Sequence, residues 1–146
     1  MSAKAYISGP ITTINPTEVL AFYEAIGSLC REIGLQPYVP HLDTDATTDV
    51  SITPSEVYEK DVQEIITSEL LIAYVGIPSV GVGAELGRAA MNGIPVILLY
   101  ERGARVSRLV RGIPTVVAEI QFNDYEDALA QLKSVLYKWQ QSGDGV

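Results

Sequence analysis

Two short, almost uninterrupted apolar runs limit the folds open to this chain of 146 residues. They occupy residues 70–75 and 95–100 and read LLIAYV and PVILLY. Alternation of apolar and polar residues would indicate a strand covered on one face only, and neither run shows it. Uniformly apolar strands are typical of parallel sheets that carry helices on both faces. The two runs therefore predict a central sheet with helices outside it.

The rest of the sequence alternates strand-like with helix-like segments. Further strands are expected at residues 4–8, 36–39 and 115–120. Residues 15–18, 53–56 and 123–126 carry helix-start chemistry, and further helices are expected at 84–91 and near 106–110. This alternation predicts an α/β fold, a flavodoxin-like doubly wound five-stranded parallel sheet in the order 2-1-3-4-5 with helices on both faces. We expect a single domain over residues 1–141 and a frayed tail over 142–146.

Composition excludes several classes of function. The net charge is −8, from 10 Lys and Arg against 18 Asp and Glu, and this repelling field argues against a nucleic-acid polymer or an anionic membrane as partner. No apolar run reaches the roughly 18 residues of a membrane span, and no secretion signal precedes the first strand. Cys30 and His41 are the single residues of their types, so a zinc site of Cys and His is ruled out. We expect a cytoplasmic protein that needs no metal and no cofactor.

The densest chemical signal lies at residues 78–89, which read PSVGVGAELGRA. Gly81 and Gly83 let a ligand approach the backbone, Ser79 adds a hydroxyl, and the following helix presents free N–H groups to an anion. The spacing fits neither a P-loop nor a dinucleotide-binding turn. On spacing alone, a phosphate or sugar site and a tight turn that only permits close packing remain equally open. Ligands of doubly wound sheets bind near the strand ends, which here indicates residues 9–13 and 78–85.

Two carboxylates stand out near this turn. Glu85 is expected in the first turn of its helix, where the helix dipole stabilises the ionised form. Asp61 shares one helical face with Tyr58, Val62 and Ile65. Glycoside cleavage usually needs two carboxyl groups in different environments, and these two could form that pair. A first-turn Glu that only complements the dipole, and a solvated Asp at the edge of the apolar stripe, remain alternatives.

Other candidates are less specific. Tyr6 precedes the Gly9-Pro10 turn and could bond to a carboxylate or line a base pocket, although a core tyrosine is the more frequent explanation. His41 is expected at the surface or against a base rather than as a general base. Arginines surround Ser107, either as a solvated helix face or as a phosphate-facing patch that serves a neighbouring subunit.

Taken together, residues 5–11, 58–61, 71–75 and 78–89 resemble the nucleoside 2-deoxyribosyltransferase superfamily, most of all its 2'-deoxynucleoside 5'-phosphate N-hydrolases. The run at 78–89 is the specific part, and the resemblance covers nearly the whole chain. It implies a flavodoxin-like fold and cleavage of the N-glycosidic bond of a nucleotide. By the same resemblance Glu85 matches the nucleophile that forms a glycosyl-enzyme intermediate. Asp61 matches the carboxylate that assists the leaving base, and Tyr6 matches the tyrosine that orients the nucleophile.

The resemblance also suggests how substrate is held. Ser79 and Ser107 match phosphate-binding serines of the hydrolases, with Ser107 reaching in from the partner of a homodimer, and His41 matches a pocket histidine. Thr12 stands where these hydrolases commonly carry Arg, so a neutral hydroxyl replaces a charge-assisted contact. The expected substrate-binding set is completed by Gly9, Pro10, Ile11, Gly81 and Gly83.

The sequence thus predicts a homodimeric glycosidase that hydrolyses (2'-deoxy)nucleoside 5'-monophosphates to free base and sugar 5-phosphate. One alternative is a nucleoside 2-deoxyribosyltransferase that exchanges bases on free nucleosides. The other is a nucleotide-binding sensor without catalysis, which would keep the glycine turn but would not need Glu85 and Asp61 together.

Overall fold

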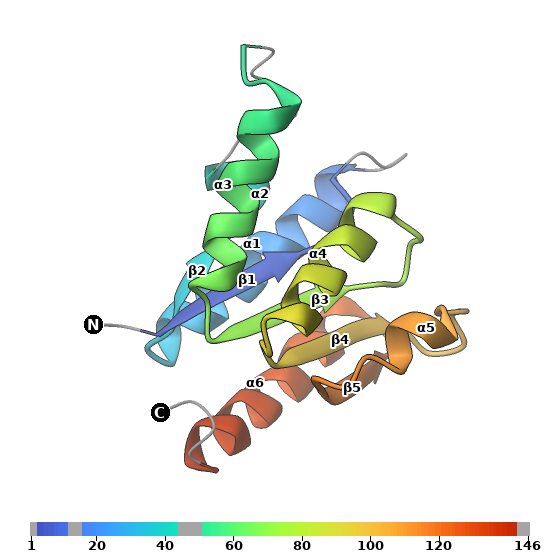
Figure 1. Cartoon of the computed structure of the whole chain (residues 1–146). Helices are drawn as coiled ribbons and strands as arrows, with labels where there is room; N and C mark the ends of the chain where they lie inside the picture. The colour runs from blue at the N-terminus through green and yellow to red at the C-terminus, as the bar shows by residue number, and fades with distance from the viewer. Residues whose placement is uncertain (1–2, 12–15, 44–50, 143–146) are drawn as a thin grey trace.

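A five-stranded parallel sheet forms the middle layer of the computed structural model, which describes residues 3–11, 16–43 and 51–142. Its strand order is β2-β1-β3-β4-β5, so the predicted order and fold class are confirmed. The strands are β1 (Lys4–Ser8), β2 (Gln36–Tyr38), β3 (Leu70–Tyr74), β4 (Val96–Glu101) and β5 (Val116–Phe122). The helices are α1 (Pro16–Glu32), α2 (Pro40–Asp43), α3 (Pro54–Ile66), α4 (Val80–Met91), α5 (Arg108–Arg111) and α6 (Tyr125–Gln141) (Figure 1).

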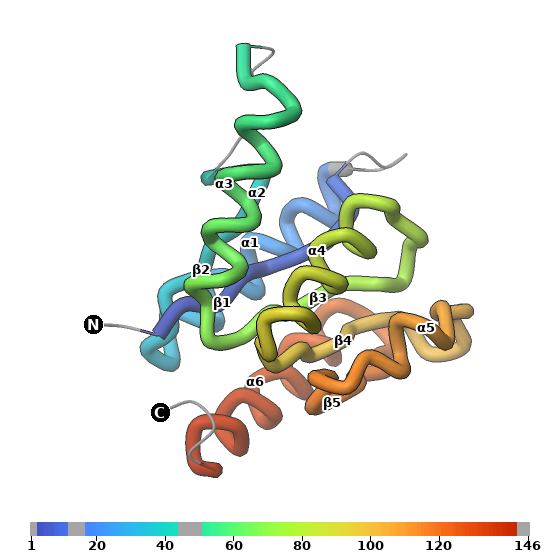
Figure 2. Tube along the Cα trace, in the orientation of Figure 1, coloured from blue at the N-terminus to red at the C-terminus, as the bar shows by residue number. Residues whose placement is uncertain are grey.

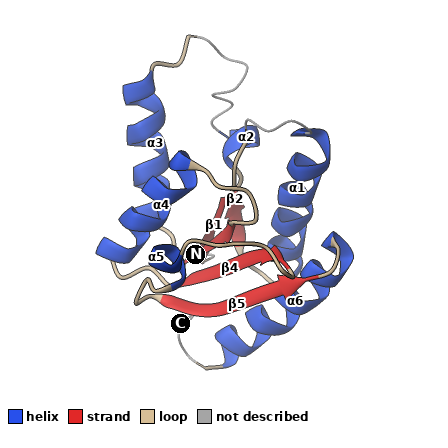
Figure 3. Cartoon of the chain, turned by 90° about the vertical axis from the view of Figure 1, so that its right-hand side faces the viewer, coloured by secondary structure: helices blue, strands red, loops and turns tan. Residues whose placement is uncertain are grey.

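The helices divide between the two faces of the sheet. Helices α1 and α6 lie on one side, and α3, α4 and α5 lie on the other (Figure 3). Each side has its own cluster of buried apolar residues. Strands β3 and β4 contribute to both clusters, because successive side chains of a strand point to opposite faces. This is why the two uniformly apolar runs fold as central strands.

Local capping explains where several helices begin. Thr53 accepts a hydrogen bond from the Glu56 backbone N–H, and the Glu56 side chain accepts one from the Thr53 backbone, which completes a capping box. The Asp124 carboxylate accepts from the Asp127 N–H at the start of α6. These starts agree with the sequence pattern. The predicted cap Asn15 lies outside the described residues.

Two segments differ from the sequence-based expectation. Helix α4 begins at Val80 instead of Ala84, because the Ser79 hydroxyl caps it by accepting from the Val82 N–H at 3.2 Å. Gly81 and Gly83 therefore lie inside the first turns of a helix rather than in a preceding turn. The short helix α2 lies directly after β2, where the sequence pattern predicts neither a helix nor a strand. Of the predicted tail, Ser142 ends α6 and the other residues lie outside the described part of the chain.

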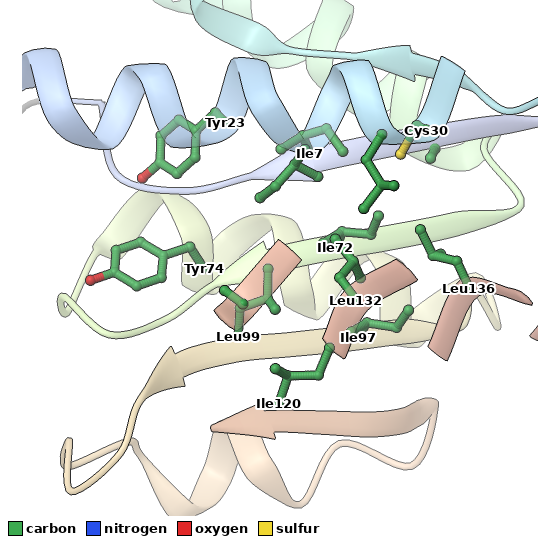
Figure 4. Packing of buried hydrophobic residues seen from close by; sticks show 14 of the residues in the cluster. Ile7, Tyr23, Cys30, Ile72, Tyr74, Ile97, Leu99, Ile120, Leu132 and Leu136 are labelled. Atoms are coloured by element: carbon green, nitrogen blue, oxygen red, sulfur yellow. The ribbon is translucent and has the colours of Figure 1, made fainter. Parts of the chain in front are cut away.

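The larger core lies between the sheet and helices α1 and α6. Strand residues Ile72, Ile97 and Leu99 meet Leu132 and Leu136 of α6 there (Figure 4). All five side chains are fully buried. Cys30 belongs to the same cluster, and burial raises the pKa of its thiol to about 12, so it packs as a neutral group. No helix within the described residues is long and apolar enough to cross a membrane.

Leu132 provides a test of this packing. Replacing it by Ala leaves a cavity between α6 and the sheet, and we expect a loss of about 2–5 kcal/mol in the free energy of unfolding. The control is Ser134→Ala on the exposed side of the same helix, which should change stability by less than about 0.5 kcal/mol. Urea denaturation of both variants measures the difference. Equal stability of the two would show that α6 does not carry the core contact described above.

Candidate active site

A pocket of about 750 Å³ opens between α3 and α4, where β1 ends. The two helices pack against each other over the same side of the sheet, as the chain trace shows (Figure 2). The pocket lies beside the boundary between β1 and β3, from which the chain winds in opposite directions, and ligands of doubly wound sheets bind at such a position. Seven predicted site residues line it: Gly9, Pro10, Ile11, Asp61, Ser79, Gly81 and Glu85.

Glu85 reaches from α4 to the end of β1. Its Oε1 accepts a hydrogen bond from the Ser8 hydroxyl at 2.8 Å, and its Oε2 accepts a short one from the Tyr6 hydroxyl. Tyr6 and Ser8 point to the same face of β1 because they are two positions apart, while Ile7 between them packs into the opposite core. Both carboxylate oxygens are thus held by donors from one strand, and the predicted contact between Tyr6 and a carboxylate is present.

The expected electrostatics of Glu85 need correction. Because α4 begins at Val80, Glu85 lies in the second turn, where the N-terminal dipole no longer dominates. Burial raises the pKa of Glu85 to about 7, helped by the nearby Asp61 charge and opposed by the hydrogen bonds from Tyr6 and Ser8. Burial also raises the pKa of Tyr6, so its phenol remains a neutral donor. An ionised Glu85 is therefore more basic than an exposed carboxylate.

Asp61 lies on the opposite wall, on the pocket-facing side of α3. The Tyr38 hydroxyl approaches its Oδ1 at 3.4 Å. The Tyr38 ring in turn stacks on Tyr6, with ring centroids 5.4 Å apart. Each carboxylate is therefore accompanied by one of two stacked tyrosines. Asp61 and Glu85 are both half-buried and interact electrostatically across the pocket, and they have different hydrogen-bond partners, as the members of acid–base pairs do.

The segment that follows β1 is held in place by the close approach of the Tyr23 ring to Gly9. A Cβ there would collide with the ring of Tyr23, whose hydroxyl donates to the Pro10 carbonyl oxygen at 2.8 Å. Any side chain at this position would displace the ring and break that bond. Gly9 thus lets α1 hold the segment that follows β1, and Thr12, further along it, lies outside the described residues.

Ser79 also borders a second, smaller pocket of about 420 Å³ between α4 and α5. Gly83, Arg105 and Ser107 line that pocket and do not line the first one. Ser107 is exposed and caps α5, its hydroxyl accepting weakly from the Val110 N–H. The structure therefore brings Ser79 and Ser107 to one cavity of the same chain, next to the carboxylate pocket.

His41 is held away from the pocket. Its Nε2 pairs with the Glu24 carboxylate at 2.9 Å, and its ring packs near Tyr23. The one-turn helix α2 directs the imidazole toward α1, while its neighbour Pro40 lines the pocket. His41 is not among the described residues that form the pocket wall.

Sequence reasoning gave no role to three residues of the site. Ser8 could have been found from the strand periodicity, since it shares a face with Tyr6. Arg88 follows Glu85 by about one helical turn and lines the pocket, and it donates through Nη2 to the Tyr58 hydroxyl at 2.7 Å. Tyr38 carried no signal, because its approach to Asp61 depends on how α3 lies over β2. Within the described ranges no group of three His, Cys, Asp or Glu side chains could hold a metal ion.

The sequence pattern of the family described as nucleoside 2-deoxyribosyltransferase matches residues 5–134. The chain belongs to this family. A relative from Methanosarcina barkeri, provisionally named 2'-deoxynucleoside 5'-phosphate N-hydrolase 1, is 35% identical over 115 residues, which are 77% of this chain and 71% of the relative. A relative of the same name from Thermofilum pendens is 30% identical over 137 residues, covering 91% of this chain and 94% of its own.

A solved structure shares the fold. The CMP N-glycosidase of Clostridium botulinum matches with a TM-score of 0.71, covering 90% of this chain and 98% of its own. Its identity of 21% limits that likeness to the fold. The conclusion on family membership therefore rests on the sequence pattern and on the two relatives.

The hydrogen bonds to Glu85 make a measurable prediction. Both stabilise the ionised carboxylate, so Ser8→Ala and Tyr6→Phe should each raise its pKa above the value of about 7. NMR titration of selectively ¹³C-labelled Glu side chains measures this directly. Ser68→Ala is the matched control, because this buried serine donates to the Glu64 carbonyl away from the pocket. An unchanged or lower pKa in both site variants would contradict the assigned bonds.

Proposed function

We propose that this family member is a glycosidase that hydrolyses the N-glycosidic bond of (2'-deoxy)nucleoside 5'-monophosphates, releasing free base and sugar 5-phosphate. The observation that carries the proposal is the arrangement of Glu85 and Asp61 on facing walls of one pocket. The names of the relatives and of the structural neighbour all refer to the bond between base and sugar. A volume of about 750 Å³ is within the usual range for small-ligand sites and has room for a nucleotide.

In the first step, an ionised Glu85 oxygen forms a bond to C1' while the C1'–N bond breaks. The electron pair of the broken bond leaves with the base nitrogen. In the productive form of the enzyme, the one proton shared by the two coupled carboxyl groups resides on Asp61, which delivers it to the base. The raised pKa of Glu85 makes its carboxylate a stronger nucleophile once ionised. Donors from Tyr6 and Ser8 fix both oxygens, so the carboxylate needs little reorganisation to attack.

In the second step, water attacks C1' and the C1'–Glu85 bond breaks, with its electron pair returning to the carboxylate. The Asp61 carboxylate takes the proton of that water and is ready for the next cycle. The overall reaction consumes one water and yields base and sugar 5-phosphate. Two displacements at C1' retain its configuration.

The 5'-phosphate is assigned to the N-terminal end of α4. Ser79 and Gly81 line the pocket there, and helix N-termini favour anions. Ser107 is assigned to the same phosphate from the partner subunit of a homodimer, because Ser107 of the same chain lines the second pocket and not the one that holds Asp61 and Glu85. In support, Val80 in the wall of the second pocket and Leu109 on α5 leave 93% and 85% of their surface exposed, as residues of an interface would in an isolated chain.

Two other functions remain candidates. A transferase would use the same glycosyl-enzyme but let a second base, rather than water, attack C1'. A sensor would bind nucleotide without turnover and would not need a doubly hydrogen-bonded carboxylate at the pocket wall. The Glu85 arrangement favours catalysis over sensing.

The first experiment is a chromatographic assay of nucleosides and their 5'-monophosphates, each with and without added acceptor base. Base and sugar 5-phosphate from monophosphates alone support the hydrolase. A new nucleoside that appears only with acceptor indicates the transferase. If no substrate gives a product but some substrates still bind, the result supports the nucleotide-binding sensor.

Glu85→Ala should lower turnover by several orders of magnitude while nucleotide still binds, because the nucleophile is lost. Asp61→Asn should lower turnover more than binding. Intact-mass spectrometry of quenched wild-type enzyme should detect a sugar phosphate adduct that is missing from Glu85→Ala. The off-site control is Glu126→Ala at the exposed start of α6, which should retain turnover. Near-normal turnover of Glu85→Ala would refute the assigned nucleophile.

A subunit-mixing experiment tests the role of Ser107. Ser107→Ala should weaken monophosphate use by about tenfold through one lost hydrogen bond. Mixing this variant with inactive Glu85→Ala places one complete site in each mixed dimer, so activity should rise to about a quarter of the wild-type value. Sedimentation confirms the dimer. If Ser107 serves its own chain, mixing produces no gain.

A further inference from the structure

Arg88 and Tyr58 join the two walls of the pocket beyond Glu85. Arg88 on α4 donates through Nη2 to the Tyr58 hydroxyl on α3 at 2.7 Å, and both residues line the pocket. Among the described lining residues, Arg88 is the single Lys or Arg. Arg88 lies on the same helix as Glu85, and the reaction steps written above give it no role. The position of Arg88 along α4 indicates what its role is.

Helix α4 sets the order of the groups along the pocket. Ser79 and Gly81 lie before Glu85, and Arg88 lies after it. At about 1.5 Å of rise per residue, Gly81 is about 6 Å on one side of Glu85 and Arg88 about 4.5 Å on the other, measured along the axis. These separations suit a nucleotide whose C1' is at Glu85. Its sugar phosphate then extends toward Ser79, and its base extends toward Arg88.

The reverse orientation is less favourable. It would move the phosphate away from the free N–H groups at the start of α4 toward the second half of the helix, where the dipole repels anions. It would also place an uncharged base against those N–H groups. The donors at the start of α4 therefore favour the phosphate at that end. The Arg88 charge also attracts anions, so the binding test below compares monophosphates with free nucleosides to separate the two orientations.

We propose, resting on the proposed function, that Arg88 recognises a carbonyl oxygen of the base, so that the preferred substrates carry oxo bases rather than adenine. A guanidinium has N–H donors and no acceptor, and it therefore suits an edge that presents carbonyl oxygens. Uracil, thymine, cytosine and guanine each carry a ring carbonyl, whereas adenine carries none. Adenine offers only ring nitrogens as acceptors, which are weaker partners for a guanidinium than a carbonyl oxygen, so we expect adenine nucleotides to bind less tightly.

The same contact assists the departure of the base. When the C1'–N bond breaks, its electron pair remains on the base and spreads to the ring carbonyl oxygen. The Arg88 N–H groups stabilise that charge until Asp61 has transferred its proton. Tyr58 is a positioning residue here, because its hydroxyl accepts one guanidinium N–H and limits where the remaining donors point.

The test measures binding separately from turnover. In a Glu85→Gln background, which prevents cleavage, calorimetry gives dissociation constants for dUMP, dAMP and the two free nucleosides. The background protein should bind dUMP at least tenfold more tightly than dAMP. Adding Arg88→Met should weaken dUMP and deoxyuridine alike by about 10–100-fold, the value of one charge-assisted hydrogen bond, and leave dAMP nearly unchanged.

Three further variants sharpen the experiment. Arg102→Met removes the same charge at an exposed site beside Asn123. It should change neither the affinity for dUMP nor the affinity for dAMP. Arg88→Lys keeps the charge but loses the planar fork, and it should recover only part of the preference. Tyr58→Phe should reduce the preference less than Arg88→Met does. Amide NMR spectra of each variant establish that the fold is intact.

The outcomes separate this inference from the proposed function. Loss of monophosphate binding with unchanged nucleoside binding would assign Arg88 to the phosphate and overturn the inference. Equal affinity for dUMP and dAMP would also overturn the inference, and so would the absence of binding of both nucleotides. If the unsubstituted enzyme cleaves monophosphates but its base preference does not depend on Arg88, the proposed hydrolase is supported and the role of Arg88 is refuted. An Arg88-dependent base preference without turnover would support the inference and refute the hydrolase.

Discussion

The burial of the Glu85 carboxylate against the end of β1 is the constraint on which the site depends. Desolvation alone would keep this group protonated, and the hydroxyls of Tyr6 and Ser8 oppose that effect. The resulting pKa of about 7 leaves a carboxylate that ionises near neutrality and is more basic than an exposed one. The fold must therefore bring β1 and α4 into register before the chemistry is available.

The rest of the architecture maintains that register. Ile7 anchors β1 in the core under α1 and α6, while its neighbours Tyr6 and Ser8 face α4. Ser79 determines where α4 begins, and this start places Glu85, about one and a half turns later, opposite the two hydroxyls. Stacking of Tyr6 on Tyr38 connects the nucleophile side of the pocket with the Asp61 side. A change at any of these contacts would alter the environment of both carboxylates.

Much of this arrangement could be predicted from periodicity and capping. The two apolar runs predicted the central strands. The capping patterns around Thr53 and Asp124 predicted where α3 and α6 begin. Glu85 and Asp61 were identified from residue type and spacing, and the structure brings them to one pocket. The placement of Glu85 in the first turn was wrong, because glycines at 81 and 83 suggested a turn where the Ser79 cap already begins a helix. The contact between Arg88 and Tyr58 was not predicted, because it joins two helices whose relative placement the sequence does not record.

The sequence by itself determined the sheet order, the family and the carboxylate candidates, because these follow from local patterns of apolar, capping and acidic residues. Only the tertiary structure decided the raised pKa of Glu85, the separation of His41 from the pocket and the position of Arg88 after Glu85 along the pocket. Each of these depends on distances between residues far apart in the chain. Desolvation and hydrogen bonding respond to such distances, and no local pattern records them.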